Sequence, residues 1–375
     1  MKRNLHAGRR RSGGLRLEVF TKDELDDIHL ATLEVLQRTG VWVEDEEAVA
    51  IFAAAGATVT GAGATAPAGA TLSAGATGAG VDAGAYAGGA VVRIPPHLVE
   101  EAIGSAPSKV VLCGRSPAND VVLEDGRVGF TNFGEGIQIV DPYTGRLREP
   151  LKQDVADCAK IVDALPEIDV LERPLGAHDV PQESAPLHNA EAIFANTTKH
   201  ATIGPLTGFC ARAMIDMAAV IAGAAASIPP GDAGVSPDGA GAGAARRAAL
   251  RARPILSFLT CPVSPLKLVA DCCRIIIEGA RGGIPVNVLS MAMAGASAPV
   301  NLAGALVTHN AEVLAGITLA QLTAKGAPIV YGSSTTAMDL RFASASVGSP
   351  ECALINAGVA CLARSYLLPS WVAGA

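Results

Sequence analysis

The sequence predicts an α/β protein built on a (β/α)8 barrel, with an open doubly wound sheet as the second choice. This prediction rests on the last third of the chain, where short apolar segments that begin with proline alternate with helical patterns. Such alternation indicates a parallel sheet with helical crossovers. No helical pattern follows the last segment, so we expect a barrel that is incomplete at its C-terminal end. The expected strands are Pro254–Thr260, Pro285–Met291, Pro328–Tyr331 and Pro369–Val372.

The helices between these strands have recognisable starts. Ser264-Pro265 supplies a cap and a proline for a first helix. Pro299 begins a longer helix that extends to about Ala324, and Ser349-Pro350 begins a third. The predicted order is therefore β-α-β-α-β-α-β.

We divide the chain into three regions. Residues 1–20 are basic and contain no apolar segment of a signal peptide, so we expect them to be disordered. Residues 21–108 form an N-terminal helical region that contains a Gly/Ala-rich insertion at 61–90. Residues 109–375 form the partial barrel, with a second Gly/Ala/Pro-rich insertion at 225–253. Insertions of this composition bury too little apolar surface to offset their ordering entropy.

Three helices are expected in the N-terminal region. Thr21 and Glu24 form a capping-box pattern for the first, which extends to Gly40. The second extends from about Asp45 to Ala55, and Pro95-Pro96 starts the third.

The middle of the chain continues with strands and helices. A helix is expected over Asp154–Leu165, and Asp141–Gly145 is predicted to be a structural turn. The expected strands are Val110–Leu112, Val128–Phe130, Asp169–Glu172 and Ala201–Gly204.

Composition excludes several classes of function. Half of the 375 residues are hydrophobic and 17% are charged, which is enough for a large core. A net charge of −7 and only 4% aromatic residues argue against nucleic-acid binding. We predict no membrane span, since no sufficiently long and strongly apolar segment occurs. The eight cysteines contain no CxxC pattern and indicate reduced thiols in the cytoplasm. We also expect a homo-oligomer.

Acidic residues at two places are candidates for a site. In the stretch from Gly326 to Asp339, an apolar strand runs into the small residues Ser333 and Ser334 and then reaches an acid. Glu135 lies between two glycines, so its carboxylate can approach a cationic substrate closely, although an ordinary exposed loop acid has the same pattern.

Two pairs with His-x-x-Glu spacing raise the question of a metal site. His188 and Glu191 form one pair, and His309 and Glu312 form the other. This spacing occurs in metal-binding helices, but no second half of a ligand set is visible. We therefore predict no metal site, and expect the second pair to make buried polar contacts.

Six segments in order resemble the trimethylamine methyltransferase family, a corrinoid-dependent group that also contains glycine betaine methyltransferases. The resemblance extends from about Phe20 to Ala375, apart from the two insertions. The segments are Arg93–Val99, Val140–Gly145, Pro262–Leu266, Met291–Gly295, Ala298–Gly304 and Val330–Ser334 with Met338-Asp339.

The resemblance implies transfer of a methyl group from an amine nitrogen to the Co(I) of a corrinoid (cobalamin) carried by a separate protein. An amine leaves readily only when it carries positive charge, so the site is expected to be lined with negative charge. Glu135, Asp339 and Glu351 are the candidates for that lining. Candidate substrate contacts are Ser333, Ser334 and Met338.

The resemblance also implies an explanation for the end of the sequence at Ala375. Trimethylamine-specific members use pyrrolysine, which is encoded by an amber codon and follows a strand that ends in a Val-Ala-Gly-like sequence. The chain ends Trp371-Val-Ala-Gly-Ala375. We therefore expect truncation at the pyrrolysine codon, and a 375-residue chain that is unstable or inactive alone. The codon after Ala375 tests this expectation.

Three alternatives remain open. The first is a glycine betaine or other quaternary-amine methyltransferase without pyrrolysine. The second is an unrelated barrel enzyme, such as an isomerase or lyase, that uses Asp339 as a base and needs no corrinoid. The third is an inactive fragment that binds an amine without turnover.

Overall fold

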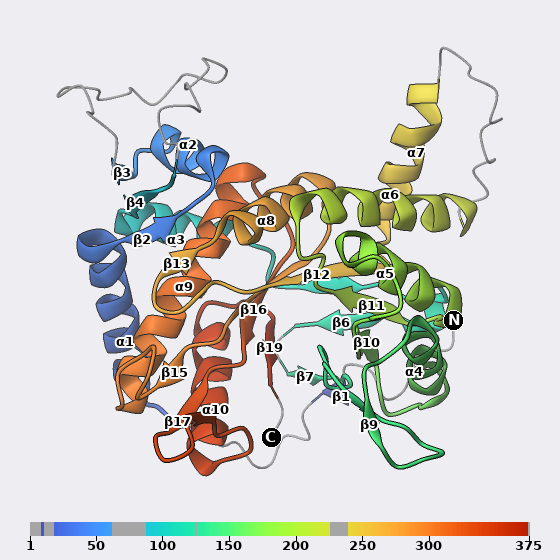
Figure 1. The fold of residues 1–375 in the computed structure, drawn as a ribbon. Helices are drawn as coiled ribbons and strands as arrows, with labels where there is room; N and C mark the ends of the chain where they lie inside the picture. The colour runs from blue at the N-terminus through green and yellow to red at the C-terminus, as the bar shows by residue number, and fades with distance from the viewer. Residues whose placement is uncertain (1–8, 11–18, 62–87, 125, 226–238, 374–375) are drawn as a thin grey trace. The chain divides into compact units, whose positions relative to one another are not determined.

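The structure is a computed structural model that describes residues 9–10, 19–61, 88–124, 126–225 and 239–373 (Figure 1). The chain divides into two compact units, and each is described by itself. The first unit comprises Met1–Gly13, Lys109–Leu259 and Gly282–Pro285. The second comprises Gly14–Ser108, Thr260–Arg281 and Val286–Ala375. Residues 62–87 of the first predicted insertion and 226–238 of the second lie outside the described residues, and the rest of the second insertion forms a helix, α7 (Gly239–Ala252), which its Gly/Ala-rich composition did not predict.

Three parallel strands form the centre of the second unit (Figure 1). Helices connect them in the predicted order, and the longest helix packs on the first two strands. This confirms the β-α-β-α-β pattern expected from the apolar segments. The elements are α8 (Ala270–Gly282), β14 (Val286–Ser290), α9 (Leu302–Thr323), β16 (Ile329–Ser333), α10 (Pro350–Ser365) and β19 (Ser370–Val372).

The register of these strands places their last residues side by side. Ser290 of β14 pairs with Ser333 of β16, and Ser333 pairs with Val372 of β19. Ser349 caps α10 by accepting a hydrogen bond from the backbone N–H of Cys352, as its sequence pattern predicts.

The first unit also contains three parallel strands, and helices again connect them. Val170 pairs with His200, and Thr202 pairs with Ser257. The predicted helix at 154–165 and the predicted strands at 169–172 and 201–204 are confirmed. The elements are α4 (Lys152–Ala164), β10 (Val170–Glu172), α5 (Ala185–Asn196), β11 (His200–Ile203), α6 (Gly208–Ala225), α7 (Gly239–Ala252) and β12 (Leu256–Thr260).

Residues 19–108 contain the three expected helices and additional strands. The capping box of Thr21 and Glu24 is present at the first helix. The additional strands pair in the order β13-β2-β4-β3, so this region is not purely helical. The elements are α1 (Lys22–Glu34), a π-helical turn (Val35–Thr39), β2 (Val41–Val43), α2 (Glu46–Ala54), β3 (Thr58–Gly61), β4 (Ala90–Arg93) and α3 (Pro96–Ser105). The fourth strand of the sheet, β13 (Lys267–Leu268), comes from a later part of the chain and pairs with β2.

The predicted helix start at Ser264-Pro265 is wrong. This peptide bond is cis, Leu266 has a φ of 55°, and β13 follows before α8 begins at Ala270. The local sequence pattern is overridden by Glu312 of α9. Its carboxylate accepts hydrogen bonds from Ser264 Oγ at 2.8 Å and from Leu266 N at 2.9 Å.

Short hairpins complete the described residues. The predicted strand at 128–130 is limited to β7, which pairs with Arg9 and Arg10, two residues of the predicted disordered terminus. The remaining elements are β1 (Arg9–Arg10), β5 (Val110–Leu112), a 3-10 turn (Pro117–Asn119), β6 (Val121–Leu123), β7 (Arg127–Val128), β8 (Ile139–Val140), β9 (Leu147–Arg148), a 3-10 turn (Gln182–Ser184), β15 (Met293–Ala294), β17 (Thr336–Asp339) and β18 (Ser344–Ala345).

A chain of hydrogen bonds connects the core of the second unit to its surface. The hydroxyl of Tyr331 donates to Asn310 Oδ1 at 2.7 Å, and Asn310 Nδ2 lies 2.8 Å from the hydroxyl of Tyr366. That hydroxyl lies 2.9 Å from His29 Nδ1, and His29 Nε2 lies 2.8 Å from Glu100. Helices α1, α3, α9 and α10 are thereby connected by polar as well as apolar contacts.

Two helices are long and apolar enough to cross a membrane. These are α6 and α9, whose most apolar windows have mean hydropathies of 1.5 and 1.3. Half of the α6 window and 72% of the α9 window are buried within the protein. Buried core helices have the same properties, so their length and composition are weak evidence for a membrane span.

Candidate functional site

An acidic and a basic residue, Glu172 and Arg173, follow one another at the carboxyl end of β10. A loop, Asn132–Gly136, lies alongside this end of the strand. The Asn132 side chain donates to the carbonyl of Glu172 at 2.8 Å and accepts from its backbone N–H at 3.0 Å. The backbone N–H groups of Glu135 and Gly136 donate to the next two carbonyls at 3.0 and 2.9 Å. These contacts fix the loop against the strand.

Glu135, the acid predicted from its flanking glycines, is paired with Arg173. Arg173 Nε donates to Glu135 Oε1 at 3.0 Å, and a second contact joins Nη2 to Oε2. The Arg173 side chain is only 7% exposed, whereas that of Glu135 is 43% exposed. Burial lowers the pKa of Arg173 to about 10. Much of the Glu135 charge is therefore compensated within the protein.

Glu172 has no such partner. Its half-buried carboxyl makes no hydrogen bond or ion pair with other residues in the described part of the chain. The carboxyl lies against the backbone of Gly134, where an added Cβ would approach Glu172 Oε1 to 2.4 Å. Burial raises the pKa of Glu172 to about 7. This side chain can therefore exchange a proton near neutral pH, a property common among residues of functional sites.

Small residues surround the two carboxyl groups. The carboxyl of Glu172 lies close to the backbone of Gly134, and Gly204 follows β11 beside Glu135. A Cβ at Gly204 would lie 3.3 Å from Glu135 Oε1. In parallel α/β folds, ligands bind at the carboxyl ends of strands. Glu172 and the ion pair of Glu135 and Arg173, all at the carboxyl end of β10, are therefore the candidate site residues of the first unit.

The sequence indicated Glu135 but did not identify Glu172 or Arg173 as site residues. The available signal was an acid-base pair directly after the buried strand Val170-Leu171. That signal does not reveal the loop that lies against the strand, because the loop comes from a segment almost forty residues earlier in the sequence.

The other predicted acids belong to the second unit. Asp339 lies at the end of β17, where its Oδ1 accepts hydrogen bonds from the backbone N–H groups of Arg341 and Phe342 at 2.8 and 3.3 Å. Glu351 is exposed in the first turn of α10, where the helix dipole favours a carboxylate. No contact joins these two carboxylates among the interactions of the described residues.

The predicted substrate contacts lie in β16, β17 and the turn between them. Ser333 is fully buried, and its hydroxyl donates to Asn356 at 3.5 Å and accepts from Thr335 N at 3.1 Å. Ser334 donates its backbone N–H to Ser290 at 2.9 Å. Met338 is half-buried in β17. The Ser333 hydroxyl is thus already engaged, whereas the Ser334 hydroxyl makes no contact of this kind with the described residues.

The buried side-chain amide of Asn287 in the second unit was also not predicted from the sequence. Both side-chain atoms of Asn287 are buried and have no hydrogen-bond partner within the described residues. An added Cβ at Gly332 would overlap its Oδ1 at 2.0 Å, so Gly332 provides the space for the amide. An asparagine between the apolar residues of a strand was the sequence signal for this feature.

The two His-x-x-Glu pairs make other contacts. Lys152 contacts both members of the first pair, with Nζ 3.4 Å from His188 Nδ1 and 2.6 Å from Glu191. In the second pair, His309 Nδ1 lies 2.9 Å from the hydroxyl of Thr335, and Glu312 is buried and binds Ser264 and Leu266, so both residues make buried polar contacts as expected. The described residues contain no group of three metal-ligating side chains.

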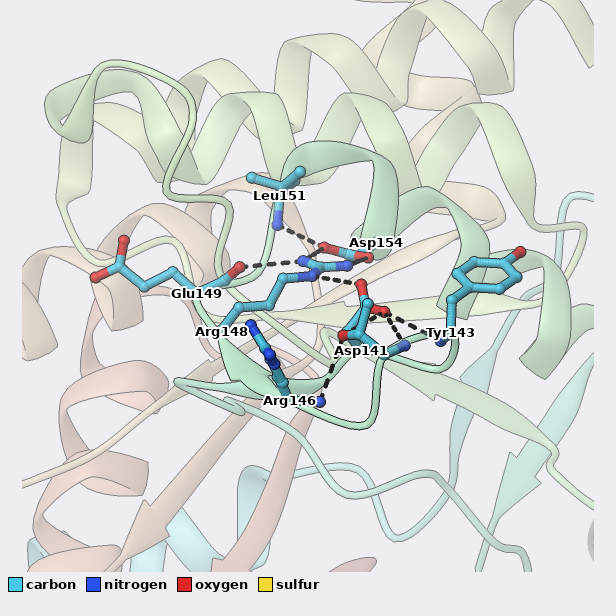
Figure 2. Close-up of polar contacts among 8 residues, drawn as sticks. Asp141, Tyr143, Arg146, Arg148, Glu149, Leu151 and Asp154 are labelled. Atoms are coloured by element: carbon cyan, nitrogen blue, oxygen red, sulfur yellow. Dashed lines mark hydrogen bonds and ion pairs between the residues drawn. The ribbon is translucent and has the colours of Figure 1, made fainter.

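The predicted turn at Asp141–Gly145 is confirmed and strongly supported (Figure 2). Arg148 Nε donates to Asp141 at 2.9 Å, and its two terminal nitrogens donate to Asp154 at 2.6 and 2.8 Å. Hydrogen bonds from Arg148 and from the turn backbone lower the pKa of Asp141 to about 2. Because Asp154 lies in α4, Arg148 fixes the hairpin of β8 and β9 to that helix.

Comparison with known proteins identifies the family. The model for "Trimethylamine methyltransferase (MTTB)" matches residues 7–230 and 240–375. The trimethylamine methyltransferase MttB of Desulfitobacterium hafniense is 46% identical over 370 residues, covering 99% of this chain and 65% of the relative. The protein of the same name from Methanosarcina barkeri is 41% identical over 377 residues, covering 100% and 67%.

Two more distant proteins are also similar. A glycine betaine methyltransferase of Desulfitobacterium hafniense is 28% identical over 354 residues, covering 94% of this chain and 63% of the relative. The crystal structure of the hydroxylamine MtmB complex matches with a TM-score of 0.50 and 12% identity, covering 95% and 62%. This likeness confirms the predicted α/β fold of barrel type.

The chain spans about two thirds of the length of the curated relatives that it matches, 65% of the first and 67% of the second. The match to the family model nevertheless covers almost all residues of this chain. The expectation drawn from the six sequence segments is confirmed: the chain belongs to the trimethylamine methyltransferase family.

Proposed function

We propose that this protein transfers a methyl group from trimethylamine to the Co(I) corrinoid of a separate partner protein. The observation that carries the proposal is the 46% identity, along 99% of the chain, to a protein named trimethylamine methyltransferase. Glycine betaine methyltransferase is much less similar, at 28% identity. The corrinoid is a second substrate in this proposal, brought to the site by its carrier.

The reaction requires a cationic nitrogen. A methyl group leaves nitrogen readily when the electron pair of the broken C–N bond neutralises a positive charge. With trimethylammonium as donor, the methyl carbon bonds to cobalt and neutral dimethylamine leaves with that electron pair. Carboxylates close to the nitrogen stabilise the bound cation. We propose that the carboxylates near the bound cation are those of Glu135, Asp339 and Glu351. The proposed substrate contacts are Ser333, Ser334 and Met338.

The ion pair with Arg173 defines what Glu135 contributes. Because one side of its carboxylate is occupied by the guanidinium, Glu135 has less charge available for a substrate than a free carboxylate. Its exposed fraction of 43% still leaves the group accessible.

We also propose a cytoplasmic location, since all eight cysteines are free thiols, as in reducing compartments.

The test is a methyl-transfer assay with purified partner. The protein translated from its complete gene is mixed with a corrinoid protein reduced to Co(I) and with trimethylamine, and the cobalt spectrum and dimethylamine are followed. We expect one dimethylamine for each corrinoid methylated. Transfer from glycine betaine but not from trimethylamine would reassign the substrate. Absence of transfer from both, or turnover of an amine without the corrinoid protein, would overturn the proposal.

A further inference from the structure

We propose that Glu172 is the carboxylate that binds the substrate's ammonium group, and that cation binding releases the proton held by Glu172. This inference rests on the proposed function, because it assigns a role within the same site. It differs from the sequence-based expectation, in which Glu135 was the acid of this loop.

The first argument is the difference between the two carboxyl groups. Glu135 is neutralised by Arg173 through two contacts. Glu172 is the next acid on the same strand end, and its carboxyl has no partner among the described residues. A ligand cation near these groups therefore gains most from Glu172, since that charge is not already compensated.

The second argument is that the backbone of Glu172 is held in place before a ligand arrives. The Asn132 side chain binds both backbone polar groups of Glu172, at 2.8 and 3.0 Å. The carboxyl packs against the backbone of Gly134, where an added Cβ would lie 2.4 Å from Oε1 and would displace it. Because the backbone of Glu172 is already held, only its side-chain torsions are left to be ordered when the carboxyl binds a cation.

The third argument concerns the groups around Glu172. Burial raises the pKa of Glu172, and the neighbouring ion pair of Glu135 and Arg173 is not among the causes. Apart from the half-buried thiol of Cys158 in α4, the titratable groups on the elements packed against β10 have partners of their own. These groups are Glu135 with Arg173, Asp169 with Phe130 N, His200 with Cys113 O and Ser257, Lys199 with three carbonyls, Asp163 with Thr197 and Thr198, Lys152 with Glu191, Asp154 with Arg148, and Asp157 with Lys160.

These observations predict coupling between cation binding and proton release. A protonated Glu172 is neutral and attracts a cation weakly, whereas the ionised form supplies the opposite charge. Since the free group titrates near neutral pH, binding shifts it to the ionised form and one proton passes to solvent. The affinity for a permanent cation should therefore rise about tenfold between pH 6 and pH 8, as the ionised fraction of Glu172 rises from about a tenth to about nine tenths.

The experiment measures binding of tetramethylammonium chloride by isothermal titration calorimetry at constant ionic strength. This cation cannot lose a proton, so any pH dependence belongs to the protein. Titrations in buffers of different ionisation enthalpy give the number of protons released. We expect close to one proton at pH 6 and close to none at pH 8.

Glu172→Gln should weaken binding at least tenfold at pH 8 and remove both the pH dependence and the proton release. Glu172→Asp keeps the charge and should retain proton release. Glu183→Gln, at an exposed acid of the same unit, is the matched control and should bind like the wild type. Far-UV circular dichroism checks that each variant is folded.

Three results would overturn the inference: no binding by the wild type, equal affinity at pH 6 and pH 8, or wild-type affinity in Glu172→Gln. If that variant does not fold, the wild-type proton count decides the question. The proposed function is tested separately, because no corrinoid is present in these titrations. Methyl transfer by a wild type without proton-coupled binding would refute this inference alone, and coupled binding without methyl transfer would refute the function alone.

Discussion

Replacing Glu172 by glutamine should change how the stability of the protein depends on pH. In the folded protein the pKa of Glu172 is about 7, compared with an ordinary value of 4.5. The folded state therefore binds this proton more tightly than the unfolded state. Consequently, the contribution of Glu172 to the free energy of unfolding is greatest below pH 4.5, and this contribution falls as the pH rises towards 7.

The size of the effect follows from the two pKa values. At about 1.36 kcal/mol for each pKa unit, the full cost of ionising Glu172 in the folded state is about 3 kcal/mol. Between pH 5 and pH 8 the wild type should lose at most about 2.5 kcal/mol from this group. Glu172→Gln does not ionise and loses none of it.

The assay is urea unfolding followed by far-UV circular dichroism at pH 5 and pH 8. The quantity to compare is the variant's free energy of unfolding minus that of the wild type, which removes the contribution of all other titrating groups. We expect this difference to increase by 1 to 2.5 kcal/mol, as an order-of-magnitude estimate, from pH 5 to pH 8. An unchanged difference would mean that burial does not alter the acidity of Glu172, and the reasoning would be refuted.

Further substitutions test other parts of the structure. Arg148→Lys should lower the urea midpoint, because lysine keeps the charge but cannot bind two carboxylates through a planar fork; Arg146→Lys, at an exposed residue of the same hairpin, should leave the midpoint unchanged. Gly316→Ala in α9 should destabilise the protein by about 1–3 kcal/mol, since the new methyl would lie 2.7 Å from Val288. Gly104→Ala in α3 should instead stabilise it by about 0.5–1 kcal/mol, because nothing lies within 4 Å. Urea unfolding measures all four variants, and an equal sign for the two glycine substitutions would contradict the packing argument.

The regular part of the fold could be predicted from sequence because its signals are local. The segments after Pro285 and Pro328 contain uninterrupted β-branched and apolar residues, and both form fully buried strands. Thr21 and Ser349 accept hydrogen bonds as helix caps, as their patterns predict. Such signals need only a few neighbouring residues.

Two features were missed because they depend on residues that are distant in sequence. Ser264-Pro265 has the pattern of a helix start, but the carboxylate of Glu312 binds Ser264 and Leu266 in a different conformation. Glu172 reads as an ordinary strand residue until Asn132 and Gly134 lie against it. In both cases tertiary contacts decide the outcome, and local propensity does not contain them.

The hydrogen-bond chain from Tyr331 to Glu100 also determines a tautomer. Asn310 Nδ2 donates to Tyr366, so the hydroxyl hydrogen of Tyr366 is free to point at His29 Nδ1. Nδ1 then accepts, and the ring hydrogen of neutral His29 must lie on Nε2, directed at Glu100. The orientation of one buried amide thus selects which nitrogen of a histidine on another helix carries its hydrogen. Rotating that amide by 180° would reverse the hydrogen bonds among Tyr331, Asn310, Tyr366 and His29, and Nε2 of neutral His29 would then be an acceptor facing the Glu100 carboxylate, which has no hydrogen to donate.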